Sequence, residues 1–81
     1  MKGDQYQPIE CSQYDIYEIA IMRGQALNIA WLDGSGCQHQ HWIRPTALNT
    51  RNGEEFLTFY IQQDHDKKLA EIRLDRIMLV E

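Results

Sequence analysis

The sequence has few cysteines, no long apolar run and no apolar stretch at its start. Its two cysteines, Cys11 and Cys37, form no Cys-x-x-Cys pair, and two cysteines are not a disulfide framework. The longest apolar runs are about four residues, such as residues 77–80, whereas a transmembrane helix needs roughly 20. Residues 1–5 do not resemble a signal peptide. We therefore expect a protein of the reducing cytoplasm, with no contact to a membrane.

Basic residues are also in short supply. The chain has 8 Lys and Arg against 12 Asp and Glu, a formal net charge of -4 and a pI near 5.2. Domains that neutralise phosphates usually carry a basic patch and a high pI, so direct binding to nucleic acid is not expected. A negative domain is better suited to a positively charged partner surface.

What the chain does contain is enough apolar material for one small core. Hydrophobic residues make up 43% of the 81 residues, which predicts a single folded domain over residues 1–81. Residues 1–8 are expected to be an extended lead-in that ends at Pro8. Apolar residues at three- and four-residue spacings then predict one helix over about residues 12–22. Ser12 is its expected N-cap, Asp15 an acidic first-turn residue and Gly24 its C-terminal stop.

After the helix the apolar period changes to two. Leu27, Ile29 and Trp31 alternate with smaller or polar residues, as in a strand, and Asp33-Gly34-Ser35-Gly36 predicts a hairpin turn. We expect a return strand over 37–43, a polar connection over 45–53, and further strands over 56–62, 69–74 and 77–80, with a turn over 63–68. The predicted fold class is mainly β with one N-terminal helix: a bent antiparallel sheet or small open barrel of about five strands.

The predicted layout offers two candidate chemical sites, a metal site and a nucleophilic cysteine. Cys37, His39 and His41 share one strand face and would converge on a metal if another element supplied a ligand, for example His65. The alternative is a polar strand face with two exposed histidines, and it is favoured because ligands on one flat strand splay apart. Cys11 or Cys37 could act as a nucleophile beside a histidine, but no orienting group is visible, and Cys11 is expected to pack as a small hydrophobe. We expect no enzyme, no metal and no cofactor.

The helix predicts a recognition surface instead. Asp15 and Glu18 are three residues apart and so share a helix face, next to Tyr14. The segment from Ser35 to Gly53 contains no acidic residue and holds Arg44 and Arg51. The alternative to a recognition face is an ordinary solvated helix with acids near its N-terminus.

Several motifs resemble the Rof (YaeO) family of Rho-binding antiterminators, in order along nearly the whole chain. They are Tyr6-Gln7-Pro8-Ile9 with Cys11, Tyr14-Asp15, Glu18 and Ala20, then Leu32-Asp33-Gly34, Glu55-Phe56-Leu57, and Glu71-Ile72-Arg73-Leu74-Asp75-Arg76-Ile77. The N-terminal and C-terminal motifs together make the resemblance specific. Two departures stand out: the stretch between Gly34 and Glu55 is about four residues longer, and Arg51-Asn52-Gly53 replaces an expected Arg-Lys-Asn.

The resemblance implies an Sm-like (Hfq-like) fold and an inhibitor of Rho-dependent transcription termination. Such a protein binds the N-terminal, RNA-binding region of Rho and blocks RNA loading at the primary sites. Carried over by motif, the partner-binding residues are Tyr14, Asp15 and Glu18 on the helix, with Arg51 and Asn52 in the loop. We expect a monomer when free. The alternative is an Sm-like module that binds RNA directly through Arg44, Arg51, His39 and His41.

Overall fold

The computed structural model describes residues 6–80 as one helix followed by an antiparallel sheet that does not close. The helix is α1 (Cys11–Arg23), and the strands are β1 (Leu27–Leu32), β2 (Gln38–Arg51), β3 (Glu54–Ile61), β4 (Ala70–Arg73) and β5 (Ile77–Leu79). A 3-10 turn, η1 (Leu74–Arg76), links β4 to β5. The strand order is β4-β3-β2-β1-β5. The predicted fold class is therefore confirmed, while most of the predicted lead-in (residues 1–5) lies outside the described residues.

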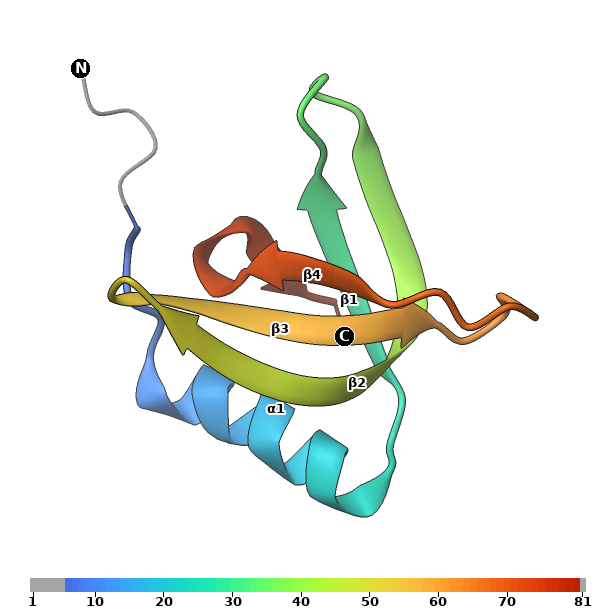
Figure 1. Cartoon of the computed structure of the whole chain (residues 1–81), viewed down its shortest axis with the longest axis horizontal. Helices are drawn as coiled ribbons and strands as arrows, with labels where there is room; N and C mark the ends of the chain where they lie inside the picture. Colours follow the sequence, from blue (N-terminus) through green and yellow to red (C-terminus); the bar gives the residue numbers. More distant parts are fainter. Residues whose placement is uncertain (1–5, 81) are drawn as a thin grey trace.

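The 14-residue strand β2 organises the sheet by pairing with two different neighbours. Its first part pairs with β1, from Gln38 to Ile43, and its second part pairs with β3, from Ile43 to Arg51. The register shifts between Pro45 and Ala47. A bulge is where a sheet tolerates a proline, and it bends the strand. The β1–β2 hairpin consequently projects away from the rest of the sheet, while α1 lies along β2 (Figure 1).

The polar connection predicted over 45–53 is wrong, and so is the end of the return strand at 43. Residues 45–51 belong to β2, and the actual turn is the dipeptide Asn52-Gly53, with φ of 52° and 76°. Two successive positive φ values fit a tight hairpin turn, for which Asn-Gly is the preferred sequence. The Asn-Gly turn signal is present in the sequence. The polar residues before it resemble a loop because they lie on the solvated face of a strand.

The predicted start of α1 also needs correction. The helix begins at Cys11, and its N-cap is Glu10, whose backbone is extended and whose side chain makes no capping bond. The Glu10 carbonyl accepts the N–H groups of Gln13 and Tyr14, so Ser12 lies inside the first turn and Asp15 beyond it. The C-terminus is as predicted: Gly24 has φ of 65°, and its N–H bonds back into the helix.

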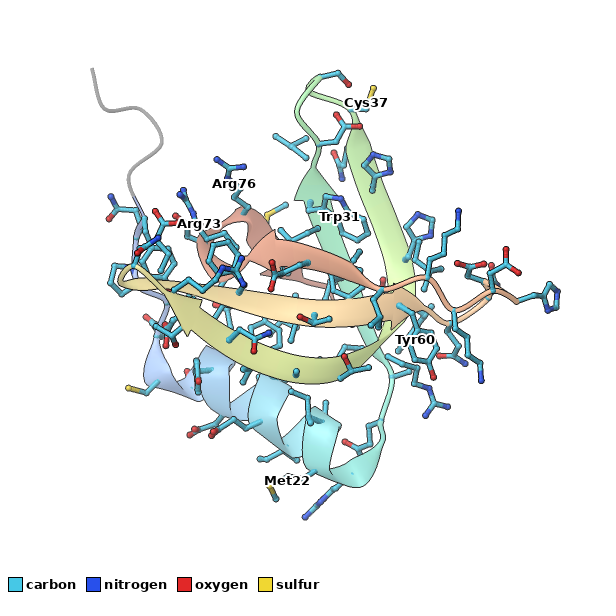
Figure 2. All side chains as sticks on the ribbon, in the orientation of Figure 1. Met22, Trp31, Cys37, Tyr60, Arg73 and Arg76 are labelled. Carbon is cyan, nitrogen blue, oxygen red and sulfur yellow. The ribbon has the colours of Figure 1, made fainter. Side chains whose placement is uncertain are left out.

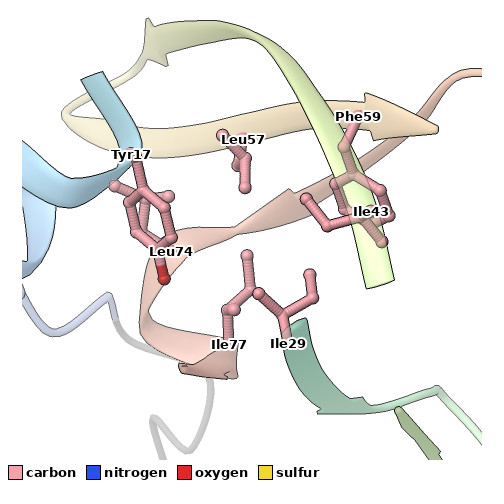
Figure 3. Close-up of a cluster of buried hydrophobic side chains, with 7 residues drawn as sticks. All are labelled: Tyr17, Ile29, Ile43, Leu57, Phe59, Leu74 and Ile77. Atoms are coloured by element: carbon pink, nitrogen blue, oxygen red, sulfur yellow. The ribbon is translucent and has the colours of Figure 1, made fainter. Parts of the chain in front are cut away.

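The core lies between α1 and the concave face of the sheet. Tyr17 and Ala20 are the buried residues of the helix. Tyr17 joins buried side chains from four strands and η1 (Figure 3), namely Ile29, Ile43, Leu57, Phe59, Leu74 and Ile77. Cys11, expected to pack as a small hydrophobe, is instead exposed at the first position of α1, where it borders a surface depression.

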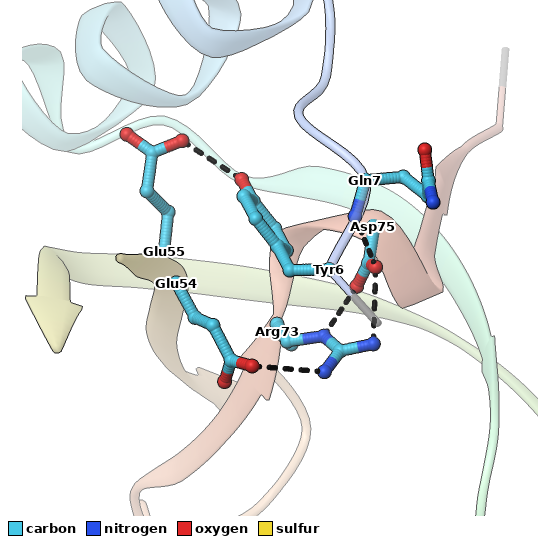
Figure 4. Close-up of polar contacts among 6 residues, drawn as sticks. All are labelled: Tyr6, Gln7, Glu54, Glu55, Arg73 and Asp75. Atoms are coloured by element: carbon cyan, nitrogen blue, oxygen red, sulfur yellow. Dashed lines mark hydrogen bonds and ion pairs between the residues drawn. The ribbon is translucent and has the colours of Figure 1, made fainter. Parts of the chain in front are cut away.

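Tyr6 and Gln7, just before α1, are hydrogen-bonded to β3 and η1. The Tyr6 hydroxyl donates to Glu55 at 2.8 Å, and the Gln7 N–H donates to Asp75 at 2.9 Å. Asp75 also receives two bonds from Arg73, and Arg73 reaches Glu54 (Figure 4). These contacts fix the chain just before α1 and so set where the helix starts on the sheet.

Candidate functional site

The outward face of α1 carries carboxylates and apolar side chains side by side. Asp15 and Glu18 are exposed, and within residues 6–80 neither forms an ion pair. On the same helix Ile19 is 43% and Met22 78% exposed. Exposed Ile and Met beside unpaired acids are not needed for the core, which takes Tyr17 and Ala20 from this helix. The helix thus presents a mixed acidic and apolar surface of the kind found at protein interfaces.

Tyr14 lies at the edge of this surface, where α1 meets β3. It is half-buried beside a shallow depression lined by Ile9, Cys11, Asp15 and Glu55. Burial, together with the nearby carboxylates of Glu55 and Glu18, raises the pKa of the Tyr14 phenol. A phenol is protonated at neutral pH even with its ordinary pKa of about 10, so Tyr14 can donate a hydrogen bond to a bound partner.

Glu55 is a site residue that the helix pattern alone did not identify. Its carboxylate accepts the Tyr6 hydroxyl, and burial and this hydrogen bond both raise the pKa of Tyr6. Glu55 comes from β3, far from Glu18 along the sequence. Glu55 lies beside Tyr14 only because the fold places the start of β3 next to the start of α1. We call the group Tyr14, Asp15, Glu18 and Glu55 the acidic helix face.

Of the two residues predicted to lie in the loop, Asn52 is in the turn between β2 and β3, whereas Arg51 is not in the loop. Arg51 is the last residue of β2, and its guanidinium makes two bonds to Glu71, at 2.9 and 2.6 Å. It also lies 4.2 Å from the centre of the Phe56 ring. The bonds to Glu71 raise the pKa of Arg51 and lower that of Glu71. Asn52 is exposed in the tight turn that follows.

The structure therefore brings the predicted residues to one end of the molecule without joining them into one cluster. The turn between β2 and β3 lies at the same end as the start of α1 (Figure 1). Tyr14 and Asp15 meet Glu55 there, and Glu18 lies on the other side of Tyr14, whose pKa it also raises. The Arg51 side chain instead turns across β3 toward Glu71. Arg51 would have to leave Glu71 before it could contact a partner.

The alternative sites are arranged differently from their prediction. His39 bonds to Asp33 at 2.8 Å and stacks on Trp31, with 5.4 Å between ring centres, while its ring centre is 6.3 Å from that of His41. Hydrogen bonds from His39, Ser35 and Cys37 keep the pKa of Asp33 well below its usual range. Cys37 is exposed near the hairpin tip (Figure 2). Across residues 6–80 there is no group of three His, Cys, Asp or Glu side chains placed to hold a metal.

The residues of the direct RNA-binding alternative do not share a surface. His39 and His41 lie on the face of β2 that carries Ile43, and Arg44 lies on the opposite face because side chains alternate along a strand. Arg51 is at the far end of the same strand and is paired with Glu71. In the described part of the chain, neither cysteine makes a hydrogen bond to a histidine.

No protein-family model matches the chain, and no curated protein matches it. Among the described residues, no helix is long and apolar enough to cross a membrane.

Proposed function

We propose that this protein inhibits Rho-dependent transcription termination by binding the RNA-binding N-terminal region of Rho through the acidic helix face. The observation that carries the proposal is the pair of exposed carboxylates, Asp15 and Glu18, which lack an ion-pair partner within residues 6–80 and lie beside the half-buried Tyr14. The resemblance of the motifs described above supplies the identity of the partner.

The chemistry of the acidic helix face suits a surface that grips RNA. Such a surface offers Arg and Lys to phosphates and aromatic or apolar walls to bases. Carboxylates of Asp15 and Glu18 would accept charge-assisted hydrogen bonds from those basic side chains in place of phosphate oxygens. Ile19 and Met22, both well exposed, would cover apolar parts of the same surface. Occupancy of the site then excludes RNA.

Glu55 extends the proposal beyond the helix. Its carboxylate lies across the depression from Asp15 and beside Tyr14, so one basic side chain of Rho can be approached from two elements. Arg51 and Asn52 have a secondary role, because Arg51 is held by Glu71 in the free protein. The proposal includes a cytoplasmic protein, monomeric when free, that has no catalytic step and needs no cofactor.

Charge reversal on the helix tests the proposal. Asp15→Lys and Glu18→Lys should each weaken binding to purified Rho by at least roughly 30-fold, since breaking a hydrogen-bonded charge pair at an interface costs about 2–5 kcal/mol. Both residues are exposed, so circular dichroism and thermal unfolding should be unchanged. Binding is measured by pull-down and titration with Rho, followed by displacement of a primary-site RNA.

Asp66→Lys is the matched control. Asp66 is an exposed acid in the 62–69 connection, so this variant makes the same change in net charge away from α1. It should bind Rho like the parent protein. A folded Asp15→Lys/Glu18→Lys double variant that still displaces RNA from Rho would rule out the acidic helix face as the binding surface.

A further inference from the structure

The positive side chains within residues 6–80 differ in their partners. Arg51 and Arg73 are ion-paired to carboxylates. By contrast, Arg44, Lys67 and Lys68, and also Arg23 at the end of α1, form no ion pair with a carboxylate within residues 6–80. Arg44 lies on β2 just before the bulge, and Lys67 and Lys68 lie near the end of the 62–69 connection that follows β3.

An exposed aromatic surface lies among these cations. Trp42 is 57% exposed on β2, although large aromatic side chains are usually buried. Arg44 is two residues further along the strand and therefore on the same face, and its cross-strand partner on β3 is Tyr60. Residues directly opposite each other on paired strands have neighbouring side chains. Trp42, Arg44 and Tyr60 thus form one continuous stretch of the outer sheet face.

Lys67 completes this surface from the following connection. Its Nζ lies 5.8 Å from the centre of the Tyr60 ring. The connection is held in shape by Asp64, whose carboxylate accepts the backbone N–H groups of Asp66 and Lys68 at 3.1 and 3.3 Å. Of the two nearby acids, Asp64 and Asp66, the Asp64 carboxylate therefore bonds to the backbone of the turn. Tyr60 lies at the opposite side of Figure 2 from Arg73 and Arg76.

We propose that Trp42, Arg44, Tyr60 and Lys67, together called the cationic aromatic face, bind single-stranded nucleic acid. Trp42 and Tyr60 would stack on bases, and Arg44, Lys67 and the adjacent Lys68 would contact phosphates, which is how single strands are bound without sequence preference. The Arg44 guanidinium donates to the Gly24 carbonyl at the end of α1, which is a neutral acceptor, so no carboxylate offsets its charge. This goes beyond the proposed function, since it uses a different surface of opposite charge.

The protein's overall negative charge does not oppose such a site at short range. Interactions between exposed charges are largely screened beyond about 8 Å at physiological salt. The local set of Arg44, Lys67 and Lys68 against Asp64 and Asp66 is net positive. The single strand would be RNA or DNA, and comparing the affinities for a ribose and a deoxyribose oligonucleotide distinguishes the two.

The test is fluorescence anisotropy of labelled oligouridine and oligodeoxythymidine titrated with the full chain. We expect binding at about 0.1 M salt, where the repulsion of distant carboxylates is screened, and a log–log salt slope of about -2, the value for three phosphate contacts on a single strand. Trp42→Ala should weaken binding roughly tenfold, in line with the loss of one stacked base. Lys67→Gln/Lys68→Gln should weaken it and flatten the slope. Arg76→Gln, which removes one exposed charge elsewhere, should bind as the parent does.

Two results would overturn the proposal. One is the absence of binding to either oligonucleotide at this salt concentration. The other is equal affinity of the parent and the Trp42→Ala variant, because then only polyanion attraction remains. If Trp42→Ala fails to fold, Trp42→Phe, which keeps a stacking ring, must retain binding while Lys67→Gln/Lys68→Gln loses it.

The outcome is separable from that of the Rho proposal. Trp42→Ala and Lys67→Gln/Lys68→Gln leave α1 untouched, so they should still bind Rho and displace its RNA. A variant that loses oligonucleotide binding but keeps this displacement shows that the acidic helix face acts on Rho rather than by sequestering RNA.

Discussion

Two arginines of the sheet, Arg73 on β4 and Arg51 on β2, make similar contacts in very different surroundings. Each guanidinium makes two bonds to one carboxylate: Arg73 to Asp75 at 2.7 and 3.1 Å, and Arg51 to Glu71 at 2.9 and 2.6 Å. The side chains of Arg73 and Asp75 are each only 9% exposed, whereas that of Arg51 is 51% exposed. Geometry does not distinguish the two pairs, but solvent does. A buried pair resists separation, and an exposed pair can exchange its partner.

The network around Arg73 extends this difference. Besides Asp75 it contacts Glu54, and its guanidinium lies 5.7 Å from the centre of the Tyr6 ring. Through Asp75 it also orders the Gln7 N–H (Figure 4). The buried Arg73 thus holds the lead-in, β3, β4 and η1 together. The same lead-in contacts Glu55 of the acidic helix face through Tyr6.

Removing Arg73 should give the largest effect on stability. Arg73→Met keeps much of the side-chain volume but removes both guanidinium bonds to Asp75, whose buried carboxylate then keeps only the bond from the Gln7 N–H and the more distant charge of Arg76. Breaking one partner of a buried pair costs about 3–5 kcal/mol, a large part of the stability of a small domain. Urea unfolding followed by circular dichroism measures the loss. Arg23→Met, at the exposed end of α1, is the control and should cost well under half as much. Equal costs for the two variants would remove the distinction between buried and exposed arginines.

The sequence predicted the helix, the first hairpin and the class of fold, because each depends on local patterns. Gly24 after the α1 stretch and Asp33-Gly34 in the first turn act within a few residues of themselves. It failed over residues 45–51, where β2 continues through a proline. A bulge that turns a strand from one neighbour to another depends on tertiary pairing, which no local pattern contains.

The candidate site divides in the same way. Asp15 and Glu18 could be placed on an exposed face from their spacing alone, and they are exposed. Glu55 could not be joined to Tyr14, nor Arg51 to Glu71, because those contacts link elements that are distant along the chain. The exposure of Trp42 could not be predicted either. Alternation along a strand shows which residues share a face, but not which face of the sheet remains uncovered.

Acid should weaken the Arg73 region before it unfolds the chain entirely. Burial opposes ionisation of Asp75, but the bonds from Arg73 and from the Gln7 N–H outweigh it and hold the pKa of Asp75 below its ordinary value of 3.8. A lowered pKa in the folded state means that the stabilisation is complete above about pH 4 and is lost as the pH falls through the folded value. Urea unfolding between pH 6 and pH 3 should show this decline.

Asp75→Asn separates this contribution from those of other carboxylates. The variant cannot ionise at residue 75, so it should be less stable at pH 6 and should lose less stability on acidification than the parent protein. Glu71→Gln is the comparison, because the pKa of Glu71 is also lowered, by its bonds from Arg51, but in an exposed position. A pH dependence in Asp75→Asn as steep as in the parent would show that the acid sensitivity arises elsewhere.

Arg51→Gln should give the smallest change in stability and yet a measurable change in binding. The Arg51–Glu71 pair is exposed, and exposed pairs contribute little because water solvates both ions when they part. The urea midpoint should therefore barely move. If Arg51 exchanges Glu71 for an acidic group of Rho, Arg51→Gln weakens binding, whereas Glu71→Gln, which frees the guanidinium beforehand, strengthens it. Opposite signs for the two variants in the same titration would identify Glu71 as a competitor for the partner. Equal affinity in all three proteins would confine recognition to the acidic helix face and leave the pair as a surface contact of the sheet.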